Sequence, residues 1–161
     1  MTTDKAIISA KAPFTIISVY DVIDHIEQQE DAIKAMRQVR AVSDKDTVIR
    51  VRCHPWTSRH GAHLYHSINK AFAHILLSDA ELQKHMTEPV RKVTRPLAEY
   101  KTIFESAGLQ IESMRKSETA LEPLFQTPEL VAAFEKKLGH NQKWQQSVLP
   151  ITFVDFVLKV P

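Results

Sequence analysis

Hydrophobic positions in the first third of the chain change their spacing twice, which predicts a strand, a helix and a second strand. Phe14–Tyr20 (FTIISVY) is dense in β-branched and aromatic residues and predicts a buried strand that is apolar on both faces. Glu30–Val42 has apolar residues at helical spacing with charges between them, which predicts a helix. In Thr47–Gly61 (TVIRVRCHPWTSRHG) apolar and charged residues alternate as far as Cys53, and Pro55 ends this strand because it has no N–H to donate. The short connections predict that the two strands are parallel, with a right-handed crossover.

Ala62–Leu77 has the pattern of a long amphipathic helix. At about 100° per residue its apolar side chains gather on one side, and the other side holds His63, His66, Lys70 and His74. Parallel strands are stable only when both faces are covered. We therefore expect this helix to cover the face of the sheet that Glu30–Val42 leaves open.

The remaining elements continue this alternation. Ser78 and Glu81 have the spacing of a helix capping box, and Gly108 stands where a left-handed residue is wanted to end a helix. Two further helices and two further strands are expected, at Leu97–Ala107, Leu109–Met114, Pro128–Leu138 and Ile151–Val160.

The composition is that of an ordinary globular protein. The chain has 161 residues, 43% hydrophobic and 25% charged, so we expect one domain over residues 1–161 with a short lead segment at 1–13. The net charge of +2 gives no case for nucleic-acid binding, and the single cysteine, Cys53, excludes an intramolecular disulfide. The N-terminus lacks the pattern of a secretory signal, and no run approaches the roughly 20 apolar residues of a membrane span. We therefore expect a cytoplasmic protein that does not act at a membrane.

Glycine is scarce, which bears on cofactor binding. The chain has three glycines, Gly61, Gly108 and Gly139, and they are far apart. A dinucleotide fingerprint or a phosphate-binding loop needs several glycines close together, so that the backbone can approach the ligand and turn tightly. The chain carries no recognisable nucleotide-binding loop.

The order of the elements is similar to that of a known family. In Leu97–Ser113 (LAEYKTIFESAGLQIES) a helix ends in a small residue plus glycine and a strand follows at once, which resembles the late helix and strand of class I S-adenosylmethionine-dependent methyltransferases. The segment FTIISVYDVIDHI resembles that family's fourth strand and the loop that faces the methyl acceptor. TVIRVRCHPW resembles the fifth strand, and ITFVDFVLKVP resembles the last strand, which inserts antiparallel beside the fifth. The resemblance implies an α/β fold, a partial Rossmann-like methyltransferase sheet that is mostly parallel, with an antiparallel strand near the C-terminus and helices on both faces.

The resemblance covers residues 14–161 and omits the elements that hold the cofactor in that family, a glycine-rich loop after the first strand and an acidic residue after the second. We therefore expect no cofactor, with S-adenosylmethionine bound only if another chain supplies the missing half. The strand at Phe14–Tyr20 would also lack one of its neighbours, and Ala6–Ile8 is too short to replace it. An apolar, unpaired strand edge invites pairing with another chain, so we expect a homo-oligomer or a protein partner at Phe14–Tyr20.

Four histidines close together in the sequence are candidate metal ligands: His54, His60, His63 and His66. His63 and His66 are three residues apart on the expected helix, so both imidazoles can reach one metal ion. A third histidine and an open position would complete a known catalytic zinc arrangement. The alternative is a solvated helix face beside Lys70, which the absence of an HExxH-type spacing favours.

Polar residues after the first two strands are the other candidates. Asp24 and His25 follow the first strand, where His25 could act as a general base near neutral pH. Capping of a helix by Asp21 or Asp24 is an equal alternative. The loop after the second strand supplies candidate substrate-binding residues, namely His54, Trp56, Arg59 and His60. Cys53 is expected to be a buried small hydrophobe, because alternation turns it away from His54.

Two functions of different classes remain open. The first is a methyltransferase-like protein that lacks the S-adenosylmethionine-binding half and acts as a non-catalytic binding or assembly module. The second is an enzyme, either the acceptor-side half of a split or truncated methyltransferase that another chain completes, or a metal-dependent hydrolase that uses the histidine cluster.

Overall fold

The computed structural model describes residues 12–59, 61–62, 64, 67–68, 70–87, 93, 95, 97–118, 127–138 and 151–161. They divide into two compact units. The first comprises the residues as far as 53 together with 95–115 and 154–161, and the second comprises 54–94 and 116–153. None of the described helices is long and apolar enough to cross a lipid bilayer.

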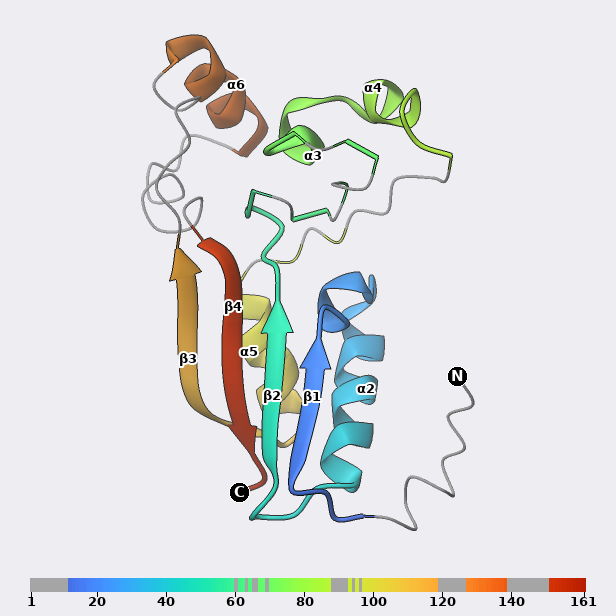
Figure 1. The fold of residues 1–161 in the computed structure, drawn as a ribbon, viewed down its shortest axis with the longest axis vertical. Helices are drawn as coiled ribbons and strands as arrows, with labels where there is room; N and C mark the ends of the chain where they lie inside the picture. Colours follow the sequence, from blue (N-terminus) through green and yellow to red (C-terminus); the bar gives the residue numbers. More distant parts are fainter. Residues whose placement is uncertain are drawn as a thin grey trace. The chain divides into compact units, whose positions relative to one another are not determined.

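A four-stranded sheet with the order β1-β2-β4-β3 carries the fold (Figure 1). Its strands are β1 (Ile16–Tyr20), β2 (Val48–Cys53), β3 (Gln110–Glu118) and β4 (Ile151–Lys159). β1 and β2 are parallel, with Val19 beside Val51, and β4 runs antiparallel to β2, with Phe156 beside Val51. These findings confirm the expected parallel pair and the antiparallel strand near the C-terminus.

The sheet is mixed, so the expectation of a mostly parallel sheet is only partly met. In Figure 1 the arrows of β1, β2 and β3 point one way and that of β4 points the other way. Because β4 lies between β2 and β3, its insertion leaves β1 and β2 as the one adjacent parallel pair of the described sheet.

Two helices pack against the sheet in the first unit. They are α2 (Gln29–Ala41) and α5 (Leu97–Ser106), which contact each other. Two arginines of α2 join them: Arg37 donates to the carbonyl of Ser106 (3.2 Å) and Arg40 to that of Gly108 (3.0 Å). Gly108 has a φ of 77°, which confirms the expected left-handed end of α5.

The apolar face of the sheet forms the core of this unit. Ile49, Val51 and Cys53 of β2 are fully buried, and Arg50 between them is exposed. The fully buried residues of α2, α5 and β4 include Met36, Ile103, Phe104, Phe156 and Leu158, and the rings of Phe104 and Phe156 are 5.0 Å apart. The alternating burial of β2 is the outcome that its sequence pattern predicted.

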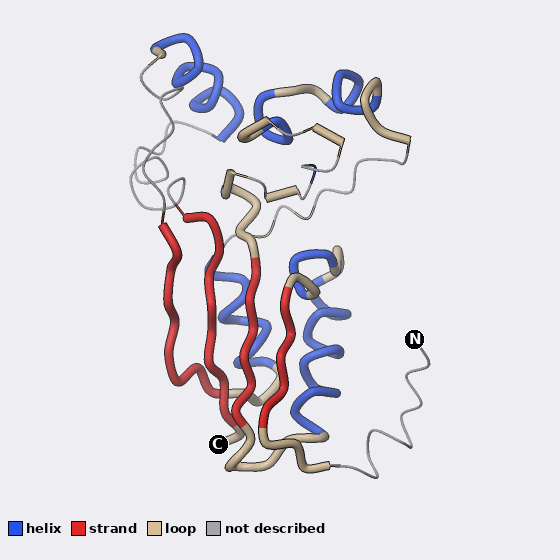
Figure 2. The backbone as a smooth tube through the Cα atoms, viewed as in Figure 1, coloured by secondary structure: helices blue, strands red, loops and turns tan. Residues whose placement is uncertain are grey.

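The described part of the second unit contains the helices α3 (Ala73–Leu76), α4 (Asp79–Gln83) and α6 (Pro128–Leu138). Phe72 and Ile75 pack against Phe134 of α6 in one cluster, and Leu64 and Ile68 pack with Leu82 in another. Ser78 caps α4 in a capping box with Glu81, as the spacing predicted. In Figure 2 the described chain between β2 and α3 is mostly loop.

The long helix expected at Ala62–Leu77 is wrong. Its described residues before α3 form turns, and Phe72 has a φ of 58°, a left-handed conformation that an α-helix cannot pass through. Leu64, Ile68 and Phe72 are nevertheless buried, so short turns bury the same apolar positions that a helix would. The long helix that was expected to cover the second face of the sheet is therefore not formed.

Candidate functional site

The segment after β1 turns sharply at the carboxyl end of the sheet, where open α/β sheets present their sites. Asp21 has a φ of 52°, and its N–H donates to the carbonyl of Arg52 on β2 (3.1 Å). A 3₁₀ turn, η1 (Ile23–His25), follows. Within it Asp24 is buried and His25 is exposed, so the two neighbouring candidates point into different surroundings.

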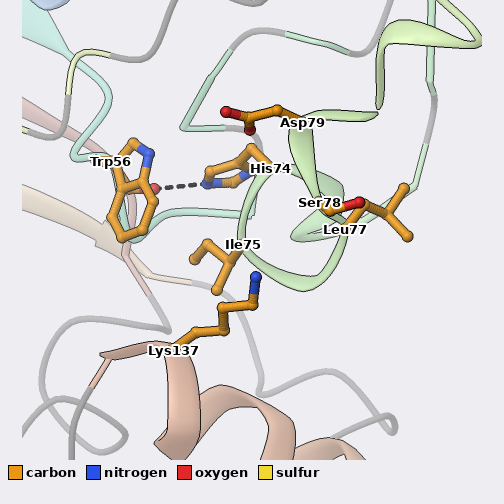
Figure 3. Close-up of a pocket in the computed structure, with 7 residues that line it drawn as sticks. All are labelled: Trp56, His74, Ile75, Leu77, Ser78, Asp79 and Lys137. Atoms are coloured by element: carbon orange, nitrogen blue, oxygen red, sulfur yellow. Dashed lines mark hydrogen bonds between the residues drawn. The ribbon is translucent and has the colours of Figure 1, made fainter. Parts of the chain in front are cut away.

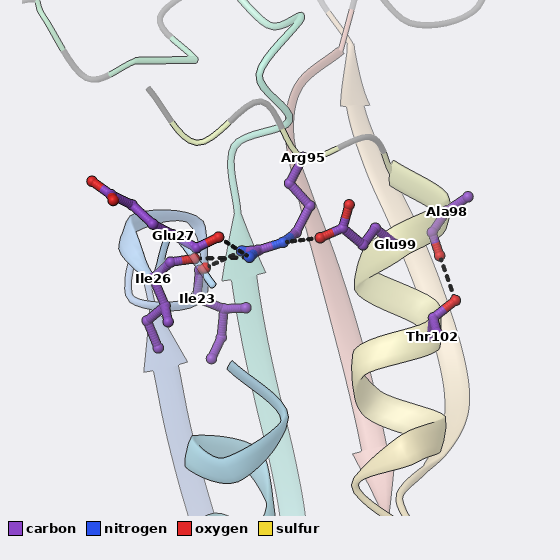
Figure 4. A network of polar contacts seen from close by, with 7 residues as sticks. All are labelled: Ile23, Ile26, Glu27, Arg95, Ala98, Glu99 and Thr102. Atoms are coloured by element: carbon purple, nitrogen blue, oxygen red, sulfur yellow. Dashed lines mark hydrogen bonds and ion pairs between the residues drawn. The ribbon is translucent and has the colours of Figure 1, made fainter. Parts of the chain in front are cut away.

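The guanidinium of Arg95 holds this segment in place (Figure 4). Arg95 is 2% exposed, and it donates to the backbone carbonyls of Ile23 (2.6 Å), Ile26 (2.8 Å) and Glu27 (3.4 Å). Its Nε also donates to the carboxylate of Glu99 on α5 (2.8 Å). A planar guanidinium can satisfy several acceptors at once, which an ammonium on a flexible stem does less well. We call this set of contacts the Arg95 clamp.

Two other polar groups at this end of the sheet are buried. Burial raises the pKa of the Cys53 thiol well above its usual value, and the nearby Asp24 carboxylate raises it further. Burial is also the main cause that raises the pKa of Tyr100, whose ring lies 5.6 Å from the Arg95 guanidinium. Both groups are therefore protonated at neutral pH, and neither is an activated nucleophile or base.

A cross-strand row of polar residues marks the other face of the sheet. Tyr20, Arg52 and Asp155 are in register on β1, β2 and β4. Arg52 binds Asp155 through two hydrogen bonds (2.8 and 3.1 Å), which raise the pKa of its guanidinium, and its charge lies 5.2 Å from the centre of the Tyr20 ring. This row fixes the register of the three strands on the face opposite the core.

The loop after β2 forms a second candidate site, a pocket of about 390 Å³ within the second unit (Figure 3). It is lined by Trp56, His74, Ile75, Leu77, Ser78, Asp79 and Lys137. The Nε2–H of His74 donates to the carbonyl of Trp56 (2.6 Å), and the two rings meet edge to face at 5.6 Å. His74 is 4% exposed, so its place on a solvated helix face, which the sequence suggested, is wrong.

The predicted substrate-binding residues have different surroundings. Trp56 lines the pocket. His54 is half-buried and donates to the carbonyl of Thr152 (2.9 Å), and the exposed Arg59 accepts the N–H of Phe72 at its backbone carbonyl (2.8 Å). His60 lies outside the described residues.

Most of the predicted metal ligands lie outside the described residues, and the predicted helix caps are wrong. Of the candidate ligands, His60, His63 and His66 lie outside the described residues, and no group of histidine, cysteine or acidic residues that could hold a metal ion occurs in the described part of the chain. Capping by Asp21 or Asp24 is wrong, because the N-cap positions of η1 and α2 are Val22 and Gln28 and neither makes a side-chain cap.

Sequence reasoning missed three residues of these sites: Arg95, His74 and Lys137. Arg95 stands in a polar connector whose burial no periodicity indicates. His74 and Lys137 are 63 positions apart on α3 and α6, so the pocket they share with Trp56 depends on tertiary packing.

Solved structures of methyltransferases share this fold at low sequence identity. No family model matches the chain, and no curated protein is significantly similar to it in sequence. The CcbJ methyltransferase from Streptomyces caelestis matches with a TM-score of 0.52 and 11% identity, over 93% of this chain and 62% of that one. An S-adenosylmethionine-dependent methyltransferase from Archaeoglobus fulgidus matches with a TM-score of 0.48 and 10% identity, over 99% of this chain and 66% of that one.

The likeness to the CcbJ methyltransferase defines the class of fold. The chain has a methyltransferase-like, Rossmann-like α/β fold, as the resemblance of its segments implied. It spans 62% of the length of the CcbJ methyltransferase and 30% of an O-methyltransferase from neocarzinostatin biosynthesis, which it matches with a TM-score of 0.46 and 10% identity over 94% of its own length. The fold is shared, and the activity of those enzymes is a separate question.

Proposed function

We propose that this chain is a methyltransferase-like binding module that does not hold S-adenosylmethionine by itself and that docks another chain along β1. The observation that carries the proposal is the place of β1 at the end of the strand order β1-β2-β4-β3. Its exposed apolar residues are Ile16 (57%) and Tyr20 (46%), and the exposed Val22 (46%) lies two residues beyond its end. Edge strands are normally protected by charges, and β1 (IISVY) has none.

The sequence supports the absence of cofactor binding by this chain alone. Its three glycines are isolated, and Gly61 and Gly108 lie in the loop after β2 and at the end of α5. Neither position is a glycine-rich turn between a strand and a helix of the kind that admits a cofactor backbone.

The chemistry at the carboxyl end of the sheet supports binding more than catalysis. The Arg95 clamp occupies three carbonyls of the segment after β1, and the buried Cys53 and Tyr100 are held protonated. His25 is the exposed titratable group of η1, and its role as a general base stays a prediction.

We further propose a second copy of this chain as the partner, because β1 is self-complementary. Antiparallel pairing about Ser18 places Ile16 opposite the partner's Tyr20 and Ile17 opposite the partner's Val19. Every pair is apolar or small, and no like charges meet. A twofold axis through Ser18 also gives the commonest symmetry of soluble oligomers.

One observation favours a second candidate, the acceptor-side half of a methyltransferase that another chain completes. The loop after β2, in the position of the fifth-strand loop of that family, lines a pocket of a size that small molecules occupy. In this alternative the pocket serves the methyl acceptor, and the other chain supplies S-adenosylmethionine.

Calorimetric titration with S-adenosylmethionine tests the proposal. We expect no binding heat from the purified chain at ligand concentrations up to the millimolar range, and the same result with S-adenosylhomocysteine. Micromolar affinity for either ligand contradicts the proposal. Binding that appears only when a second, co-purified protein is present favours the acceptor-side half.

A further inference from the structure

The pocket beside Trp56 has walls that are already fixed. Its volume of about 390 Å³ lies in the range of small-molecule sites. The carbonyl of Trp56 accepts the Nε2–H of His74, and a Cβ on Gly61 would stand 2.2 Å from the same carbonyl oxygen, so Gly61 allows the backbone to close here. Ile75, 2% exposed, packs against Phe134 behind the pocket. A ligand would therefore meet a preformed surface, which lowers the entropic cost of binding.

One donor in this pocket has no partner of its own. The indole Nε1 of Trp56 is buried, and it makes no hydrogen bond to the described residues. Buried indole N–H groups usually find an acceptor, since an unsatisfied buried donor is costly. In Figure 3 this nitrogen lies on the edge of the ring turned toward His74 and Asp79. Because the nitrogen has almost no exposed surface, a ligand oxygen reaches it only when a side chain that covers it shifts, and the new hydrogen bond would then remove that cost.

The charge in the pocket comes from Lys137. Figure 3 shows its side chain reaching from α6 toward Ile75. Its positive charge is felt nearby, because it is one of the smaller causes that lower the pKa of Glu81, after the hydrogen bonds from Ser78. The apolar surface between Lys137 and the indole is that of Ile75 and Leu77. The pocket thus offers a cation, an apolar wall and a buried donor.

We propose that this pocket binds a small carboxylic acid with an aromatic or apolar body and a second oxygen acceptor. The carboxylate pairs with Lys137, the body lies against Ile75 and the Trp56 ring, and the second oxygen accepts from the indole N–H. Asp79 at the rim disfavours a second negative charge, which restricts the ligand to a monoanion. This inference goes beyond the docking of another chain at β1 and does not depend on it.

The test follows the Trp56 indole N–H directly. The chain has two tryptophans, so a Trp144→Phe variant assigns the Trp56 indole signal in a ¹H–¹⁵N correlation spectrum. The probes are 4-hydroxybenzoate and its neutral amide, 4-hydroxybenzamide, titrated to 20 mM. We expect a saturable shift of the Trp56 indole signal with the acid, and weaker binding of the amide by roughly fivefold, the effect of one partly exposed ion pair.

Matched variants separate the charge from the fold. Lys137→Gln should weaken 4-hydroxybenzoate roughly fivefold and leave the amide unchanged, whereas Lys136→Gln, the neighbouring exposed lysine of α6, should change neither. Trp56→Phe keeps an aromatic side chain but removes the indole N–H, and it should weaken both probes in a calorimetric titration, which replaces the indole signal as the readout for this variant. The absence of a saturable shift, equal affinity for acid and amide, or equal effects of the two lysine variants overturns the proposal.

Discussion

A single buried arginine determines the conformation of the segment after β1. Arg95 is 2% exposed and makes its hydrogen bonds to backbone carbonyls and to Glu99, so its charge is satisfied without a carboxylate directly on the segment. Removal of one donor would leave a buried carbonyl unsatisfied, which costs more than the hydrogen bond contributes. The residues of η1 are held in place by the hydrogen bonds that the Arg95 guanidinium donates to the carbonyls of this segment.

Arg95→Lys should destabilise the protein by about 2–3 kcal/mol, because an ammonium keeps the charge but cannot satisfy the same set of acceptors. Urea unfolding followed by circular dichroism measures the change. The control is Arg37→Lys, an exposed arginine with one bond to the carbonyl of Ser106, which should cost less than about 0.5 kcal/mol. Equal losses in the two variants would contradict the role given to the Arg95 clamp.

Cys53 should make stability fall as the pH rises. Its pKa is raised in the folded protein, so the unfolded chain loses the thiol proton first, from about pH 8.5 upward, while the folded chain keeps it. The unfolded state then binds fewer protons, and the free energy of unfolding decreases by about 1.4 kcal/mol per pH unit above that value.

Urea unfolding between pH 7 and pH 10 measures this slope. A Cys53→Ala variant should be less stable overall, and its free energy of unfolding should depend less on pH up to about pH 10. Above that pH, tyrosine ionisation also contributes. The same slope in both proteins would assign it to other groups. The single cysteine also allows a check by thiol labelling, which should need unfolding.

At the scale of elements, hydrophobic periodicity predicted the helices and strands whose apolar residues face a core. α6 was expected at Pro128–Leu138 and has those bounds, and β2 and α2 end within two residues of their expected bounds. β3 was expected to end at Met114 and extends to Glu118, because its polar residues pair with β4 without being buried. The length of such a strand depends on its pairing partner, which the sequence of the strand itself does not indicate.

The expected helix at Ala62–Leu77 shows the opposite limit. Its apolar residues recur at helical spacing, and Leu64, Ile68 and Phe72 are buried as that spacing requires. The chain reaches this burial through turns, with the N–H of Phe72 bonded to the carbonyl of Arg59 (2.8 Å). The same pattern of burial is compatible with two backbones, so the spacing of apolar residues alone does not decide between a helix and a series of turns.

The cap of α4 should carry much of the stability of that short helix. Ser78→Ala removes the side-chain oxygen that accepts the N–H of Glu81 and should cost about 1 kcal/mol. Thermal unfolding measures it, with Ser67→Ala, an exposed serine of the same unit, as the control. A Ser78 variant as stable as the Ser67 variant would show that tertiary packing alone holds α4.

At the scale of the whole molecule, the proposed pairing through the edge strand β1 predicts a dimer. We expect light scattering at tens of micromolar protein to give twice the monomer mass. Ser18→Lys should give a monomer, because two lysines would face each other across the proposed twofold axis. Gln38→Lys adds the same charge on the exposed side of α2 and should remain a dimer. A monomeric parent protein, or dimers of both variants, would contradict pairing through β1.

The strand order has a consequence for synthesis. Because β4 lies between β2 and β3, a nascent chain on the ribosome makes both neighbours before the strand that joins them exists. Asp155, the partner of Arg52, is synthesised 103 residues after it. Until then β2 and β3 each expose the edge that β4 will cover. Closure of the sheet is thus the last step and a slow one, since contacts this distant in sequence form late. Rapid synthesis raises the concentration of chains whose β2 and β3 edges are still unpaired, and such edges can pair with other chains. Slower elongation, or a chaperone that shields β2, should therefore raise the soluble yield.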